Sequence, residues 1–283
     1  MKSPSPRRDD GATLLADLEA YYDEVPRAFA TAEDIGGLTL FVRRDPEGWP
    51  YYARPRLGSG GAVSRDDVDR VRSRQREEGA PESFEWVEEI SPALGPALRE
   101  AGLEVERHPL MVLAEPLAAE VPHGVRIAVL SESDPDHVLG GTTAAVSAAF
   151  AEVDAVEAID RAERVGAIRG RLSEGRLRLV GAFAEDADDR ADGLADEEQS
   201  VRAVGGGSHG PRGLVSELTG IAVLPRWRGR GVGAAVTAAL VDDARARGVR
   251  TVFLSAGSQR VADLYARVGF VRVGTACTAE PAR

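Results

Sequence analysis

The segment LTGIAVLPRWRGRGVG, residues 218–233, most constrains what this chain can fold into. Its apolar part reads as a strand that ends at a proline, and arginines and glycines then lead into the helix-like run at 234–248. Glycine lets the backbone approach a ligand closely, and the first N–H groups of a helix have no partner within it. This order therefore predicts an anion-binding loop at a helix N-terminus, where the helix dipole adds positive charge.

Composition limits the class of protein. The 283 residues suffice for two domains, and 43% apolar with 29% charged residues is typical of a soluble, globular chain. No apolar run is long enough to cross a membrane, and MKSPSPRRDD lacks the apolar core of a secretory signal. Cys277 is the single cysteine, which excludes an internal disulfide and favours the cytoplasm. A net charge of −11 argues against nucleic-acid binding.

Apolar periodicity and turn residues alternate along the chain between strand and helix character. This alternation predicts an α/β or α+β sheet with helices on its faces. We expect a disordered tail at 1–11, a first domain at 12–115, a linker at 116–124 and a second domain at 125–283. The acidic stretch 185–200 is expected to be a loop. The predicted helices are 14–32, 66–78, 92–101, 136–152, 156–174, 232–247 and 261–268, and the predicted strands are 38–43, 50–57, 84–88, 103–113, 125–130, 177–184, 201–206, 214–223, 251–254 and 270–275.

Two familiar phosphate-binding motifs do not fit the loop. The ATP-binding P-loop needs a Gly-Lys-Ser/Thr ending, and Lys2 is the only lysine of the chain. Gly229, Gly231 and Ala234 match G-x-G-x-x-[GA] in letters, but the next strand ends in Leu254-Ser255-Ala256, without the acid that holds a ribose. A nicotinamide or flavin site is therefore not expected.

Three features in order fit another family. Val223-Leu-Pro225 ends the strand, Arg228-x-x-Gly231-x-Gly233 follows, and Tyr265-x-x-x-Gly269-Phe270 comes further on. In this order they closely resemble the GNAT superfamily of N-acetyltransferases, from residue 125 to the C-terminus. The resemblance implies a central mixed sheet flanked by helices.

The same resemblance implies acetyl-CoA as co-substrate and no metal. Its pantetheine arm would lie along the strand at Ile221, Ala222 and Val223, and its diphosphate would rest on the backbone of the loop. Ser255 and Ser258 are candidates for contact with the coenzyme, with a turn role as the alternative. The loop residues in question are Arg228, Gly229, Arg230, Gly231, Val232, Gly233 and Ala234. The side chain of Arg228, and less so that of Arg230, would add positive charge for the phosphates, with a solvated side chain as the alternative.

The resemblance also implies the residues that move protons. Glu217 is the candidate base, expected to share one face with Thr219, Ile221 and Val223 by the period of two, with a surface glutamate as the alternative. An apolar sheet would raise the pKa of its carboxyl. Tyr265 would protonate the departing thiolate, since an unperturbed phenol has a pKa of about 10, and a buried structural tyrosine is the alternative.

An internal echo suggests a second, incomplete copy of the fold in the N-terminal half. The segment from Phe84 to Leu103 matches that from Phe253 to Phe270 as strand, helix, Gly-apolar and strand. In this copy Leu98 takes the place of Tyr265, and the equivalent glycine loop at 58–61 lacks the arginine, so catalysis there is not expected.

The expected activity is transfer of an acetyl group to a primary amine of a small molecule or peptide, by direct attack in a ternary complex. A catalytically inactive acyl-CoA sensor and a modifier of protein N-termini or lysines are the alternatives. No nucleic-acid or membrane partner is expected, and a homodimer is left open. The histidines form no constellation in sequence: His209 is expected in a Gly-rich turn at 205–213, and no spacing suggests a metal site.

Overall fold

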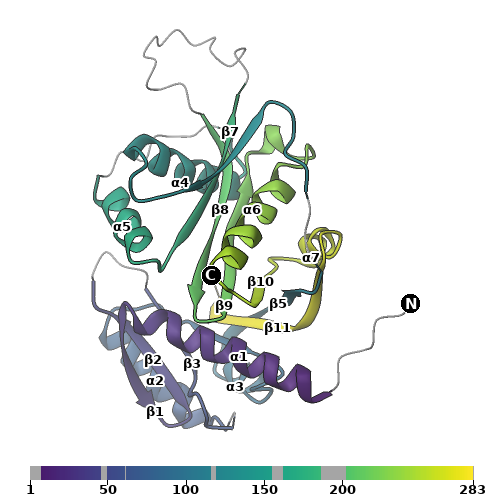
Figure 1. The fold of residues 1–283 in the computed structure, drawn as a ribbon. Coiled ribbons are helices and arrows are strands. Elements are labelled where there is room, and N and C mark those ends of the chain that lie inside the picture. Colours follow the sequence, from purple (N-terminus) through teal and green to yellow (C-terminus); the bar gives the residue numbers. More distant parts are fainter. Residues whose placement is uncertain are drawn as a thin grey trace. The chain divides into compact units, whose positions relative to one another are not determined.

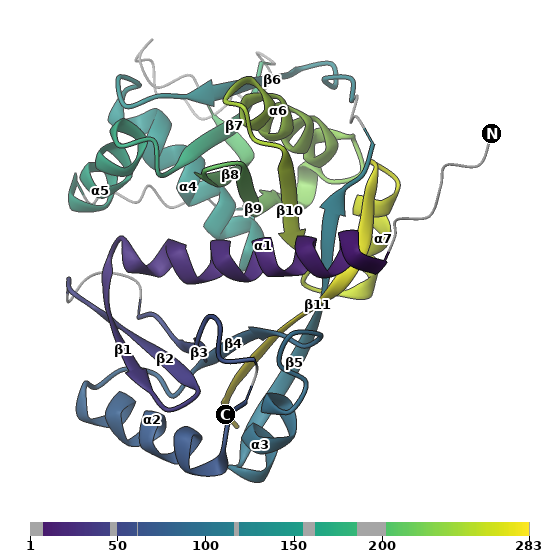
Figure 2. The same ribbon diagram turned by 60° about the horizontal axis from the view of Figure 1, so that its bottom comes forward.

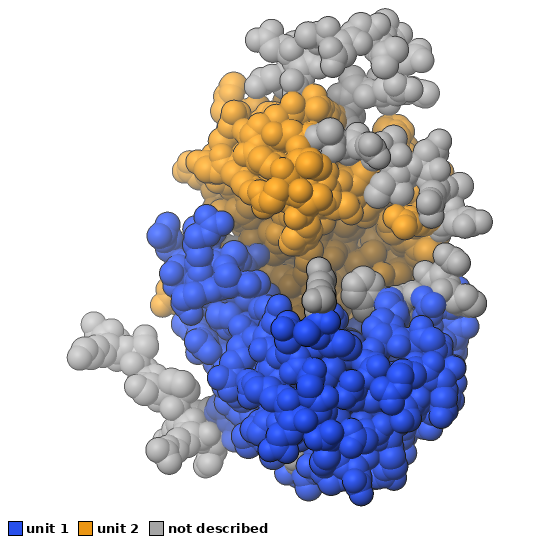
Figure 3. Space-filling model, turned by 180° about the vertical axis from the view of Figure 1, so that it is seen from behind, with its two compact units in different colours: residues 1–112, 255–267, 271–283 blue, residues 113–254, 268–270 orange. Residues whose placement is uncertain are grey.

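The computed structural model describes residues 8–45, 50–60, 62–115, 119–154, 162–185 and 202–282. The chain forms two compact units that are not contiguous in sequence (Figure 3). The first comprises residues 1–112, 255–267 and 271–283, and the second comprises residues 113–254 and 268–270. The segments after residue 254 lie largely with the first unit because the last strand pairs with Phe84–Val87 in the first half of the chain.

The first unit holds a sheet in the order β1-β2-β3-β4-β11-β5, with helices on both faces (Figure 2). Apolar residues of α2 and α3, among them Val71 and Leu98, pack on one face of it. On the other face Glu19 of α1 accepts a hydrogen bond from the buried Arg54 of β3 (2.7 Å). The elements are α1 (Arg8–Arg27), β1 (Ala30–Ile35), β2 (Leu38–Arg43), β3 (Ala53–Pro55), α2 (Arg65–Glu77), β4 (Phe84–Val87), α3 (Leu94–Glu100), β5 (Leu103–Leu113), α7 (Gln259–Ala266) and β11 (Phe270–Pro281).

The N-terminal predictions need correction. The tail predicted at 1–11 is wrong for residues 8–11, which belong to α1, and residues 1–7 lie outside the described ranges. The predicted helix at 14–32 ends at Arg27, one residue after Pro26. Residues 30–35 form β1 instead, joined to β2 by a two-residue Gly36-Gly37 hairpin turn in which Gly36 has φ +61°. A Gly-Gly pair between two short strands is typical of a hairpin. The helical periodicity of the preceding residues led to the wrong prediction of a helix up to residue 32.

The second unit holds strands in the order β10-β9-β8-β7-β6. Neighbours pair antiparallel, except that β10 runs parallel to β9, so the sheet is mixed. In Figure 1, α4 and α6 cover opposite faces of β8. The elements are β6 (Val125–Leu130), α4 (Asp136–Phe150), α5 (Ala162–Ser173), β7 (Arg178–Ala184), β8 (Ala203–Arg212), β9 (Val215–Val223), the 3-10 turn η3 (Pro225–Trp227), α6 (Val232–Ala246) and β10 (Thr251–Ser255).

The prediction of a sheet with helices on its faces is confirmed. The prediction of a Gly-rich turn at 205–213 is wrong, because β8 runs through nearly all of this segment. Glycine is needed there for close packing: a Cβ on Gly205 would lie 2.6 Å from a carbonyl oxygen of β9. Nearly all of the acidic stretch 185–200 lies outside the described ranges. None of the helices in those ranges combines the length and apolar character needed to cross a bilayer.

The two units share a pattern of strand connections. The series β1-β2-β3-α2-β4 has two antiparallel pairings and then a parallel one. The series β7-β8-β9-α6-β10 has the same order and the same senses. This shared pattern supports the interpretation of the chain as two copies of one fold.

Candidate active site

Strand β9 carries a bulge at the point where the candidate ligand-binding residues begin. Ser208 of β8 lies opposite Thr219, and Gly206 lies opposite Ala222, so β9 has one residue more than β8 between these pairs. Gly220 sits in the bulge with φ +62°, a conformation that favours glycine.

The bulge changes which side chains share a face of the sheet. Thr219 pairs with the Ser208 hydroxyl (2.9 Å) on the α4 face, whereas a Cβ on Gly207 would lie 2.9 Å from Ile221 and 3.0 Å from Leu240 of α6. The prediction that Glu217, Thr219, Ile221 and Val223 share one face is therefore wrong: the extra residue reverses the alternation. Glu217 and Thr219 face α4, and Ile221 faces α6.

Strands β9 and β10 pair over a short stretch only. Their parallel register runs from Val215 to Glu217 on β9, opposite residues 251–253 on β10, while β9 continues to Val223 along β8. The half-buried Glu217 therefore lies where the two parallel strands part. Beyond it, the edge of β9 that faces β10 is available to an extended ligand.

The predicted glycine loop joins β9 to the 15-residue helix α6. Gly229 and Gly231 have φ +73° and +91°, so both need the left-handed freedom of glycine. The first helical hydrogen bond of α6 is donated by the N–H of Ala235 to the carbonyl of Gly231 (3.0 Å). Within the described ranges, no backbone carbonyl accepts a hydrogen bond from the N–H groups of residues 229–234. Consecutive free donors at a helix N-terminus suit an anion with several oxygens.

Helix α2 of the first unit, which follows β3 as α6 follows β9, begins with a capping box. Ser64 accepts a hydrogen bond from the N–H of Asp67 (3.1 Å), and the Asp67 carboxylate accepts from the N–H groups of Ser64 (3.0 Å) and Gly37 (3.3 Å). These hydrogen bonds keep the pKa of Asp67 below its usual value against the opposing effect of burial. Helix α2 thus carries a carboxylate and a side-chain cap of its own in the first turn, whereas α6 follows Gly231 without a side-chain cap.

The two loop arginines contact the protein in different ways. Arg228 donates from Nε to the carbonyl of Val223 (2.9 Å), from Nη1 to Glu152 (2.7 Å) and from Nη2 to the carbonyl of Ala149 (2.9 Å). The guanidinium of Arg230 lies over the ring of Trp227, 4.9 Å from its centroid. The structure therefore directs the Arg228 side chain toward the end of α4.

The remaining predicted site residues belong to the first unit. Tyr265 is half-buried in α7, and desolvation raises its pKa to about 12, so its hydroxyl stays protonated at neutral pH. Ser258 caps α7 by accepting a hydrogen bond from the N–H of Val261 (3.3 Å), and Ser255 is exposed at the end of β10. Burial raises the pKa of Cys277 to about 11, which makes it a poor nucleophile.

A buried polar network in the second unit was missed from the sequence. His209 binds Ser216 through Nδ1 (2.9 Å) and Asp243 through Nε2 (2.9 Å), and Asp243 also accepts hydrogen bonds from Arg178 and Arg247. The statement that the histidines form no constellation is thus wrong for His209. Ser216 and His209 are fully buried, so this Ser-His-Asp series joins α6 to β8 and β9 and does not meet a substrate.

The network predicts how stability depends on pH. Burial lowers the pKa of His209 from 6.5, against the attraction of Asp243. Below about pH 6.5, His209 therefore binds a proton in the unfolded chain but stays neutral in the folded chain. The free energy of unfolding falls by up to about 1.4 kcal/mol per pH unit until the pKa of His209 in the folded protein is reached. Thermal unfolding between pH 7.5 and 5 should show a shallower fall in His209→Gln than in the parent protein. His137→Gln, on an exposed residue of α4, is the control, and equal slopes in all three proteins would contradict the prediction.

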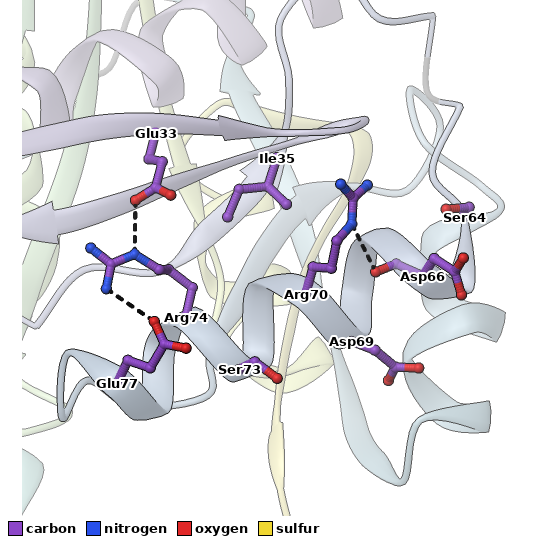
Figure 4. A pocket seen from close by; sticks show the side chains of 9 residues that line it. All are labelled: Glu33, Ile35, Ser64, Asp66, Asp69, Arg70, Ser73, Arg74 and Glu77. Carbon is purple, nitrogen blue, oxygen red and sulfur yellow. Dashed lines mark hydrogen bonds and ion pairs between the residues drawn. The ribbon is translucent and has the colours of Figure 1, made fainter.

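A groove of about 870 Å³ lies apart from these residues, between β1 and α2 of the first unit (Figure 4). At one end of the groove Arg74 binds Glu33 (3.1 Å) and Glu77 (3.5 Å). No group of three or more His, Cys, Asp or Glu side chains in the described ranges is placed to hold a metal ion. We therefore place the candidate site at β9 and the N-terminus of α6.

A family model matches part of the chain. Residues 158–270 match the family model described as the acetyltransferase (GNAT) family, a span that includes β9, the glycine loop and α6. A search of curated proteins gives no match to the sequence.

Solved structures show the same fold over nearly the whole chain. A GCN5-related N-acetyltransferase from Kribbella flavida is 20% identical, with a TM-score of 0.70 over 95% of this chain and 96% of its own. A second such enzyme, from Sphaerobacter thermophilus, is 18% identical, with a TM-score of 0.59 over 99% and 96%. A tandem GNAT protein from the clavulanic acid biosynthesis pathway is 18% identical, with a TM-score of 0.55 over 98% and 97%. Residues 158–270 therefore resemble the GNAT family of acetyltransferases, and the chain shares its fold with solved structures of that kind.

Proposed function

We propose that this protein transfers an acetyl group from acetyl-CoA to a primary amine of a small molecule or peptide. The acceptor nitrogen attacks the thioester carbonyl directly, the C–N bond forms, and the C–S bond breaks to release coenzyme A. The match of residues 158–270 to the acetyltransferase (GNAT) family model supports acetyl transfer, and the chemistry of the described residues supports the details.

The observation that carries the proposal is the run of N–H groups at residues 229–234, which find no backbone carbonyl partner in the part of the chain that the structure describes. A diphosphate offers several acceptor oxygens and negative charge, which the helix dipole favours at the same place. Gly229 and Gly231 have the left-handed backbone conformation that glycine favours, and the absence of a side chain leaves room for a phosphate close to the backbone. Val232, Gly233 and Ala234 supply the N–H groups of the first turn of α6.

The parting of β9 from β10 suits the extended arm of the coenzyme. An amide-containing chain laid along Ile221, Ala222 and Val223 pairs with backbone groups as an added strand would. This arrangement brings the thioester end of the arm toward Glu217, where the two strands separate.

Two side chains handle protons in this proposal. Glu217 accepts the proton that the amine loses, directly or through a water molecule. Tyr265 donates its hydroxyl proton to the departing thiolate and, with a pKa of about 12, holds that proton until the thiolate forms. The protonated amine loses two protons in all: one replaces the proton that Tyr265 gives to the thiolate, and the other is released to water. The products are therefore an amide, free coenzyme A and one proton.

The first unit is proposed to be an inactive copy. The Asp67 carboxylate adds negative charge at the N-terminus of α2, which disfavours a diphosphate there, and Leu98, at the position of Tyr265, is fully buried in the core. One coenzyme molecule is therefore expected per chain.

The acceptor is identified by measuring thiol release from acetyl-CoA with simple amines, polyamines, aminoglycosides, and peptides with free N-termini or lysines. A net charge of −11 suits a cationic acceptor. Release that depends on one class of amine, with the acetylated product seen by mass spectrometry, supports the proposal. Coenzyme binding without thiol release from any amine would instead favour an acyl-CoA sensor.

Gly231→Ala tests the loop directly. A residue other than glycine at φ +91° costs about 1–2 kcal/mol. Without coenzyme, the loop of this variant therefore leaves the left-handed conformation. Binding has to restore that conformation, which raises the Kd for coenzyme A about five- to thirtyfold. Gly248→Ala is a matched control: Gly248, with φ +84° and no atom within 4 Å of a new Cβ, lies just beyond the other end of α6. Both variants should remain folded, and only Gly231→Ala should bind the coenzyme more weakly by calorimetry. Equal Kd values would place the diphosphate elsewhere.

A further inference from the structure

The strongest unassigned feature of the second unit is the attachment of the coenzyme loop to the end of α4. The Arg228 guanidinium reaches both, with Nη1 on the Glu152 carboxylate (2.7 Å) and Nη2 on the carbonyl of Ala149 (2.9 Å). A second link lies beside it, because the N–H of Arg226 donates to the Asp154 carboxylate (3.0 Å). The loop that precedes α6 is thus fastened to residues 149–154 at several points.

The conformation of Glu152 shows what this attachment does locally. Glu152 has φ +59°, and among the described residues it is the non-glycine with positive φ. It stands just after α4, where a chain usually places glycine to reverse its direction. Arg228 satisfies a carbonyl at the open end of the helix and binds the Glu152 carboxylate, so it holds a turn that the backbone of Glu152 does not favour.

The helix held in this way covers the chemical face of the sheet. Thr142 and Val146 of α4 are the side chains that a Cβ on Gly206 would meet, at 2.8 and 3.4 Å. Glu217 and Thr219 of β9 point to this same face. The end of α4 and the coenzyme loop therefore meet at Arg228, on the side of the sheet where the proposed base lies.

We propose that Arg228 is a positioning residue that couples the coenzyme loop to the acceptor side of the site through the end of α4, and does not bind phosphate with its side chain. This inference rests on the proposed function. The planar guanidinium group of Arg228 donates hydrogen bonds from Nε, Nη1 and Nη2 in fixed directions. The single ammonium group of lysine cannot reproduce these three directions. A phosphate contact, by contrast, tolerates lysine as a point charge.

The test compares Arg228→Lys, Arg228→Gln and Glu152→Gln, the last on an exposed carboxylate whose loss leaves the core intact. We expect KM for the acceptor to rise about tenfold in both Arg228 variants, with the calorimetric Kd for coenzyme A within about threefold of the parent. In the double variant, Glu152→Gln should add little to the rise in acceptor KM that Arg228→Gln causes, because each substitution removes the same ion pair. Arg245→Gln, which removes a guanidinium bound to the carbonyls of Val249 and Arg250 at the other end of α6, should change neither constant.

Two outcomes would overturn the inference. One is a coenzyme Kd that rises about tenfold in Arg228→Gln and recovers in Arg228→Lys, which is the signature of a phosphate contact. The other is acceptor KM effects of Glu152→Gln and Arg228→Gln that are independent and multiply.

Amide hydrogen exchange separates this inference from the proposed function. The N–H groups of Ala151, Glu152 and Val153 donate to carbonyls in the last turn of α4. Without any coenzyme, we expect them to exchange about tenfold faster in Arg228→Gln than in the parent or in Arg245→Gln. Unchanged exchange would contradict the attachment, whereas faster exchange in a protein that binds no coenzyme would uphold it and reject the proposed function.

Discussion

Replacing Glu217 by glutamine is expected to lower kcat/KM for amine acetylation by about 10²–10⁴-fold, the usual contribution of a positioned general base. Glutamine keeps the size and polarity of the side chain at the parting of β9 and β10, and removes only its ability to accept a proton. The Kd for coenzyme A should stay within about threefold of the parent, because the binding contacts are made by backbone groups further along the chain.

The pH dependence of this defect distinguishes a base from a structural glutamate. A primary amine has a pKa near 10.4, so a growing fraction of it is already neutral as the pH rises. If Glu217 removes the proton, the defect of Glu217→Gln shrinks steadily between pH 7 and 10. A defect that is constant over this range would show that Glu217 acts on structure alone. Glu174→Gln, on an exposed glutamate paired with Arg176, controls for the change in net charge.

Removing the hydroxyl of Tyr265 is expected to lower kcat by about ten- to a thousandfold, the range for loss of a general acid. The phenylalanine ring keeps the packing of the half-buried side chain, so stability and coenzyme affinity should change little. Because the pKa of Tyr265 is about 12, its hydroxyl does not titrate below about pH 10. Removing the hydroxyl should therefore lower kcat by the same factor at each pH below about 10, without shifting the pH dependence of kcat.

Stopped-flow measurement of thiol release at saturating acetyl-CoA and acceptor is the direct assay for this variant. Tyr51→Phe, which removes a hydroxyl in the first unit between β2 and β3, should leave the rate unchanged. A Tyr265→Phe protein with the parent rate would remove Tyr265 from the mechanism. One with the parent rate but weakened coenzyme binding would assign it a binding role.

The parts of the fold that follow local rules were predictable from the sequence. Strands 103–113 and 125–130 match β5 and β6, since apolar runs bounded by turn residues specify a strand without knowledge of its neighbours. The glycine loop and the start of α6 at Val232 were equally clear, because Gly229 and Gly231 mark left-handed backbone before a helix.

Other features depend on contacts between distant parts of the chain and were not predictable. The bulge at Gly220 arises from register with β8, and one extra residue was enough to move Ile221 to the face opposite Thr219. His209 joins Asp243 of α6 across 34 residues of sequence, a pairing that no local pattern signals. The direction of the Arg228 side chain is set by the end of α4, 79 residues away at Ala149.

Calorimetric titration with coenzyme A tests the central claim, that the backbone of residues 229–234 binds the diphosphate. We predict one site per chain, with heat that is reduced or shifted to higher concentration in Gly231→Ala and retained in Gly248→Ala. The absence of any heat at millimolar coenzyme A, with the folded parent protein, would contradict the account.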